Sequence, residues 1–143
     1  MKTQNLENHK RLHPLYHFFM VPISVLTIIL AVYLTFTNEN FIEGIFYLLL
    51  SCLLGLTILL TRVYSLSTQN RLIRVEMRLR YFELTSRHFS EVENQLNLSQ
   101  IIALRFAGDE ELEALIQKTI EEKLTSEEIK KRVKDWKGDY YRI

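Results

Sequence analysis

YHFFMVPISVLTIILAVYLTF, residues 16–36, is an uncharged run that decides the fold. A second apolar run, IFYLLLSCLLGLTILLT at residues 45–61, follows closely and can be extended through Phe41, Ile42 and Gly44. A helix needs about 20 apolar residues to cross the hydrocarbon core of a membrane. Both runs meet this length. The sequence therefore predicts two transmembrane helices, at about residues 15–36 and 41–64, in an all-α protein.

The loop between the two runs is short and holds no basic residue. It consists of TNEN at residues 37–40, which predicts a tight helical hairpin. Basic residues flank the outer ends of the hairpin instead: Lys2, Lys10, Arg11, Arg62, Arg71, Arg74 and Arg78. The positive-inside rule then predicts that both termini are cytoplasmic. The first run is too long for a signal-peptide core and lacks a small-residue cleavage pattern, so we expect a retained anchor.

Small residues recur along both apolar runs. Ser24 and Ala31 lie on one side of the first helix, and Ser51 and Gly55 form a Ser-x-x-x-Gly pair in the second. Small side chains let two helix backbones approach closely within a membrane. These four residues are therefore the predicted helix–helix seam of the hairpin.

Three histidines lie before or at the start of the first run, at intervals of four residues. They are His9, His13 and His17, within HKRLHPLYHFF at residues 9–19. Pro14 interrupts their common face, because proline fits the first position of a helix and not its interior. That leaves His13 and His17 as an incomplete pair of zinc ligands. Hydrogen bonding at the membrane surface is the favoured interpretation, and neither a metal nor a cofactor is expected.

Neither glycine nor proline occurs between Gly55 and Gly108, so the second helix is expected to continue into a cytoplasmic stalk over residues 65–89. On a helical wheel the stalk has two apolar stripes on roughly opposite sides. One stripe is Leu72, Val75, Leu79 and Phe82, and the other is Ile73, Met77, Tyr81 and Leu84. We expect the C-terminal helices to cover one stripe and an oligomer or partner to cover the other. The pattern leaves open which stripe is which.

Charged residues fill the two gaps between the stripes. Arg71, Arg74 and Arg78 occupy one gap and form a solvated face, or contact lipid headgroups or a partner. Glu76–Arg80 and Glu83–Arg87 occupy the other, with the spacing of i,i+4 ion pairs. Aromatic residues do not alternate with the arginines, so we expect no nucleic-acid partner.

Three short helices are predicted after the stalk. Ser99 is expected to cap LSQIIALRF, Asp109 to cap DEELEALIQKTIEEKL, and Thr125 with Glu128 to form a capping box for the last helix. The predicted organisation is a flank and transmembrane hairpin over residues 1–64, followed by a stalk and a small helical domain over residues 65–143.

The sequence lacks the common motifs of nucleotide-binding and catalytic sites. The one cysteine, Cys52, lies in an apolar run, and the chain has no G-x-G-x-x-G, Walker A or G-x-S-x-G motif. The 18 basic and 17 acidic residues are nearly balanced, so the chain as a whole carries no basic field. We expect that the protein is not an enzyme.

Four segments of the sequence resemble one protein family. They are QNLENHKRLHPLYHFF, NRLIRVEMRLR, LSQIIALRFAGDEELEALI and IKKRVKDWKGDYYRI, which together reach nearly the whole chain. The resemblance is to a family of small bacterial membrane proteins of unknown function, sometimes given permease-like names. It implies a two-span protein with a cytoplasmic helical tail, which we place in the bacterial inner membrane. It implies no activity, substrate or catalytic residue.

These observations favour a structural or interaction role in the lipid bilayer, through a homo-oligomer or a membrane protein partner. The alternative is an oligomeric channel or a transport accessory subunit, whose pore exists only between protomers.

Overall fold

The computed structural model describes residues 13–138. Their regular secondary structure is helical, and their only β-type pairing is an isolated bridge between Ala107 and Trp136. They form two compact units, and the boundary falls between Leu66 and Ser67. Helix α2 begins in the first unit and ends in the second.

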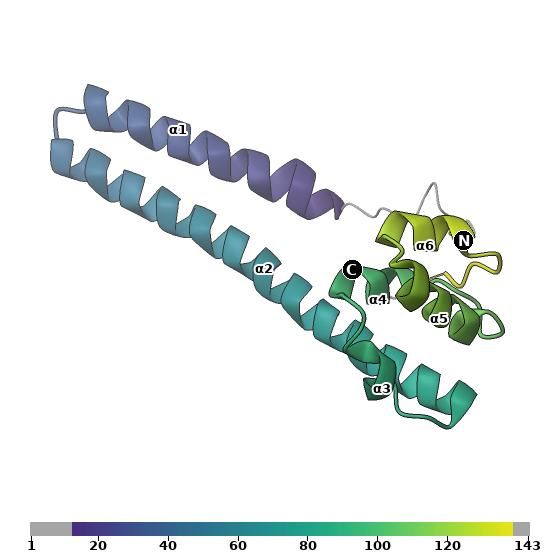
Figure 1. The fold of residues 1–143 in the computed structure, drawn as a ribbon. Helices are drawn as coiled ribbons and strands as arrows, with labels where there is room; N and C mark the ends of the chain where they lie inside the picture. The colour runs from purple at the N-terminus through teal and green to yellow at the C-terminus, as the bar shows by residue number, and fades with distance from the viewer. Residues whose placement is uncertain (1–12, 139–143) are drawn as a thin grey trace. The chain divides into compact units, whose positions relative to one another are not determined.

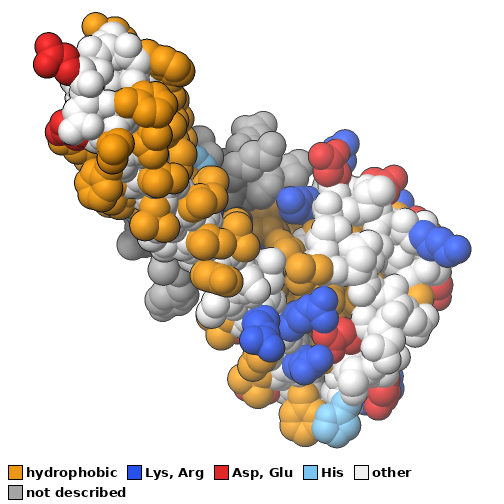
Figure 2. All heavy atoms as spheres, turned by 90° about the vertical axis from the view of Figure 1, so that its left-hand side faces the viewer, with side chains coloured by type: hydrophobic (Ala, Val, Ile, Leu, Met, Phe, Trp, Pro, Cys, Tyr) orange, Lys and Arg blue, Asp and Glu red, His pale blue; other side chains and the backbone are white. Residues whose placement is uncertain are grey.

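The first unit is a helical hairpin (Figure 1). It consists of η1 (Tyr16–Met20), α1 (Val21–Thr37) and the first part of α2 (Phe41–Thr85). Two helical segments, Tyr16–Thr37 and α2, are long and apolar enough to cross a membrane. Figure 2 shows apolar side chains over most of the visible surface of this hairpin. Exposed apolar side chains on both helices are what a lipid solvent requires.

The helix begins at Pro14, as the sequence predicted. A π-helical turn, η1, directly precedes α1, and Pro22 is the second residue of α1. A proline ring collides with the carbonyl group one turn earlier in a regular helix, and a wider turn moves that carbonyl away.

Helices α1 and α2 approach each other through small residues. Ala31 is 4% exposed and Ser51 is 6% exposed. A Cβ atom added to Gly55 would lie 3.2 Å from Ser24 Oγ, so all four residues of the expected seam lie between the two helices or at their contact. Gly44 marks a still closer approach, because a Cβ atom there would overlap the backbone of Thr35.

Within the described residues, the second unit holds four helices besides the end of α2. They are α3 (Ser90–Glu93), α4 (Leu98–Leu104), α5 (Leu112–Glu122) and α6 (Ser126–Arg132). The sequence predicted three helices and missed α3, which has only one turn. It also placed the end of the stalk at residue 89, whereas α2 ends at Thr85. Ser86 adopts a left-handed φ of 56°, and the chain then reverses.

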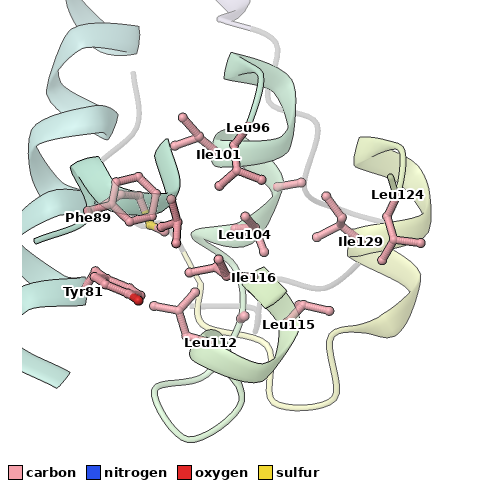
Figure 3. Close-up of a cluster of buried hydrophobic side chains, with 14 of the residues drawn as sticks. Tyr81, Phe89, Leu96, Ile101, Leu104, Leu112, Leu115, Ile116, Leu124 and Ile129 are labelled. Atoms are coloured by element: carbon pink, nitrogen blue, oxygen red, sulfur yellow. The ribbon is translucent and has the colours of Figure 1, made fainter. Parts of the chain in front are cut away.

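One apolar core unites these helices with α2 (Figure 3). Side chains from α4, α5 and α6 meet at its centre, where Ile101, Ile116 and Ile129 are fully buried. Tyr81 from α2 and Phe89 from the following turn close one side, with ring centroids 5.3 Å apart. Burying side chains of this size contributes about 1.5–3 kcal/mol each relative to exposure. The core therefore fixes α2 to the C-terminal helices within this unit.

Two of the three predicted helix caps were wrong. Asn97 caps α4, because its side-chain oxygen accepts a hydrogen bond from the Gln100 N–H and the Asn97 N–H donates to the Gln100 side-chain oxygen. Ser99 was the predicted cap, and it donates to Asn97 instead. Asp109 does not cap α5, which begins after Glu111. The capping box of Thr125 and Glu128 on α6 is confirmed.

The last described residues pack back on the α4–α5 connection. The Lys137 N–H donates to the Phe106 carbonyl at 2.8 Å, and the rings of Phe106 and Trp136 stack at 4.7 Å. The Glu111 carboxylate accepts hydrogen bonds from the N–H groups of Lys134 and Asp135, each at 3.1 Å. These contacts join α6 and the residues after it to the rest of the unit.

Candidate functional site

The two apolar stripes of α2 have different environments. Ile73, Met77 and Tyr81 are 4%, 1% and 2% exposed and belong to the apolar core. Leu84 was expected to belong with them, but it is 44% exposed. It lies one residue before the end of α2. The stripe that faces the C-terminal helices is therefore the one that starts at Ile73, and it has three buried members.

The opposite stripe is exposed along its whole length. Leu72, Val75, Leu79 and Phe82 are 56%, 58%, 59% and 47% exposed, and we call these four residues the outer stripe. The Phe82 ring stacks on His88 at 5.5 Å, and Phe82 remains half exposed. An unbroken row of large apolar side chains on a charged helix is a feature of interaction surfaces.

The arginine-rich flank of α2 is partly engaged within the molecule. Arg78 Nε donates to Glu93 at 2.7 Å, and Arg74 donates to the same carboxylate at 3.4 Å. Glu93 is buried, and its hydrogen bond and charge raise the pKa of Arg78. Two of these arginines are thus paired with α3 and stay half exposed. Contact of the three arginines with lipid headgroups or a partner stays a prediction. The exposed Arg71 side chain has no such pair among the described residues.

The other flank of α2 is tied to the C-terminal helices by long-range contacts. Arg80 donates to Asp109 at 2.7 Å and to the carbonyl oxygens of Arg105 and Ala107. Arg87 follows the end of α2, and its Nη1 lies 3.4 Å from Glu113 Oε1. The expected i,i+4 pairs of Arg80 with Glu76 and of Arg87 with Glu83 were therefore wrong.

These tertiary pairs leave two carboxylates available. Glu76 and Glu83 are exposed, and neither side chain has an ion pair or hydrogen bond among residues 13–138. The outer stripe is thus bordered by exposed arginine on one flank and by exposed glutamate on the other. The sequence could not show this directly, because it does not reveal which arginines the folded chain engages.

Two carboxyl groups in the second unit have lowered pKa values, one between α4 and α5 and one in α6. The Arg80 hydrogen bond, with help from Lys137, lowers the pKa of Asp109 below its ordinary value of 3.8. Backbone and side-chain hydrogen bonds from Thr125 lower the pKa of Glu128. Both carboxylates hold structural contacts, and neither shift creates a group poised to exchange protons near neutral pH.

The histidine pair lies at the start of the hairpin. His13 Nδ1 accepts the Tyr16 N–H at 3.4 Å, so His13 acts as a cap on the first turn. The His17 ring meets the Tyr16 ring edge-on at 5.0 Å, and Arg62 lies 5.5 Å from the centroid of the same Tyr16 ring. His9 falls outside the described residues. Within residues 13–138, no group of three or more His, Cys, Asp or Glu side chains is placed to hold a metal.

One family model matches the chain over residues 1–143, and its description is "Family of unknown function (DUF6526)". The chain therefore belongs to this family, which confirms that the resemblance seen in the sequence is to a family of unknown function. The description mentions neither a membrane nor an organism. No curated protein and no solved structure matched the chain.

Proposed function

We propose that this family member is a non-enzymatic assembly module of the bacterial inner membrane. The hairpin anchors the chain in the bilayer, with both termini in the cytoplasm, and α2 carries an intermolecular contact beyond the membrane surface. The apolar surface of the hairpin and the basic residues beyond its outer ends support this arrangement.

The exposure of the outer stripe is the observation that carries the proposal. The C-terminal helices cover only one side of α2, so four large apolar side chains remain in water. Burial of such a side chain is favourable by about 1.5–3 kcal/mol. A chain held in a bilayer meets its neighbours in one orientation. Contact with a neighbour through the outer stripe removes the four apolar side chains from water.

Paired substitutions on the two stripes test the proposal. Leu72→Ser with Leu79→Ser should lower the mass of the protein–detergent particle. It should leave the second unit, which we also call the C-terminal unit, folded. Ile73→Ser with Met77→Ser should unfold that unit, because each change buries a hydroxyl group and opens a cavity in the core. Size-exclusion chromatography with light scattering gives the mass, and Trp136 fluorescence reports the fold. A monomeric wild type with no stoichiometric partner would contradict the proposal.

A further inference from the structure

The outer stripe has the spacing of a coiled-coil seam. Its members are separated by three, four and three residues, which places Leu72 and Leu79 at heptad positions a and Val75 and Phe82 at positions d. The same register assigns Ile73, Met77 and Tyr81 to positions b, f and c, on the far side of the helix. These are the residues that the chain's own core buries.

The charges beside the stripe follow the same heptads. Arg71 and Arg78 occupy positions g, and Glu76 and Glu83 occupy positions e. In a parallel pair of helices, a g residue meets the e residue of the next heptad on the neighbour. Arg71 would then face Glu76 of the other copy, and Arg78 would face Glu83. Each contact occurs twice, because the symmetry of the pair repeats it.

The opposite orientation is disfavoured by the same charges. Antiparallel helices bring g beside g and e beside e, so arginine would meet arginine and glutamate would meet glutamate. Like charges at such positions destabilise an association. The charge pattern is therefore complementary to itself in the parallel orientation, which is the orientation that a shared membrane anchor imposes.

The folded chain leaves most of these groups free to pair. Arg71, Glu76 and Glu83 are exposed and have no side-chain partner among the described residues. Arg78 uses Nε to bind Glu93 and remains 55% exposed. The four residues of the outer stripe are exposed and are not among the buried residues of the core.

We propose that the partner of the outer stripe is a second copy of this chain, bound as a parallel, in-register two-helix coiled coil over residues 71–83. This inference rests on the proposed assembly role and specifies its partner. Ser65 and Thr68 occupy the preceding a and d positions, so the apolar seam is limited to two heptads. A seam of two heptads is too short to be stable alone. Anchoring both chains in one bilayer raises the effective concentration of the two helices and so favours their association.

Charge reversal at one contact tests the pairing without touching the core. Arg71→Glu and Glu76→Arg should each reduce dimer formation in liposomes by about five- to thirty-fold, since two like-charge contacts replace two attractive ones. A mixture of the two variants should form a heterodimer near the wild-type level, because each arginine again faces a glutamate. Energy transfer between chains that carry donor and acceptor fluorophores measures the fraction of each dimer.

A cysteine in the seam supplies an independent readout. In a Cys52→Ser background and with an added chemical oxidant, Val75→Cys should form a disulfide between the two copies of a parallel pair, since equivalent d positions lie side by side. The exposed Ala114→Cys serves as the control for random collision. Cross-linking at Val75 above this control, together with rescue by the mixed variants, supports the proposal.

Two failures have different meanings. If Leu72→Ser with Leu79→Ser dissociates an assembly, while Val75→Cys does not cross-link and the mixed variants show no rescue, the second-copy inference is wrong and the assembly role stands. If the outer-stripe substitutions change no assembly at all, both are wrong.

Discussion

Asp109 shows how a single side chain connects distant parts of the C-terminal unit. Its carboxylate accepts a hydrogen bond from Arg80 on α2 and two from Lys137 near the end of the described chain. Arg80 is only 15% exposed and also binds two backbone carbonyl groups. Loss of the carboxylate therefore leaves a largely buried guanidinium group with fewer partners.

The acidity of Asp109 gives the C-terminal unit a predictable response to pH. A carboxyl group with a lowered pKa in the folded state adds stability above its unfolded pKa, and this stability is lost as the pH falls through the folded pKa. The wild type should therefore lose stability below about pH 4. Asp109→Asn should melt at a lower temperature at pH 7 and show a shallower decline below pH 4, with Glu128 responsible for part of the remaining slope.

Thermal unfolding of the full chain in detergent, followed by Trp136 fluorescence, measures both effects. Glu121→Gln is the matched control, because Glu121 is exposed and has no ion pair in the described structure. Identical pH dependence in Asp109→Asn and the wild type would show that the ion pair adds no stability.

At the level of elements, the α1–α2 contact depends on the absence of a side chain at Gly44. A Cβ atom there would overlap backbone atoms of Thr35, which cannot rotate away. Gly44→Ala should therefore push the helices apart and destabilise the hairpin by about 1–3 kcal/mol. Gly55→Ala is the matched control, since its Cβ would meet the Ser24 hydroxyl and the end of Ile28, and side chains can shift.

The unfolding of the two glycine variants in detergent, followed by circular dichroism, compares them directly. Equal stability of Gly44→Ala and Gly55→Ala would mean that the helices do not approach as closely at Gly44 as the structure shows.

Some local features of these elements could be predicted from the sequence, and the long-range side-chain pairs could not. The two partners of the Thr125–Glu128 capping box lie three positions apart, so they are visible together in the sequence. The Arg80–Asp109 pair joins residues 29 positions apart. In the sequence, Arg80 could equally pair with Glu76, and Asp109 could equally cap a helix. Leu84 has the helical position of a core residue. It lies at the end of α2, however, and is 44% exposed.

The same distinction applies to the candidate site. Helical periodicity was sufficient to find both stripes, because each follows from residue spacing alone. Identifying the exposed one required the path of the chain after Ser86. The free glutamates also became apparent only when Arg80 and Arg87 were seen to bind elsewhere.

At the scale of the whole molecule, the proposed topology places residues 37–40 outside the cytoplasm. In a Cys52→Ser background, a cysteine at Asn38 should react with a membrane-impermeant thiol reagent in intact cells. A cysteine at Ser126 should react only after the membrane is opened. Labelling at Ser126 but not at Asn38 in intact cells would show the opposite orientation and contradict the proposed topology.

Helix α2 uses one face for the core of its own chain, and we propose that its other face makes an intermolecular contact. The most direct measurement is the mass of the wild-type particle excised from its native membrane with a lipid-retaining polymer, after subtraction of lipid and polymer. We expect at least two copies of the chain in each particle. A single copy without any stoichiometric partner would contradict the claim.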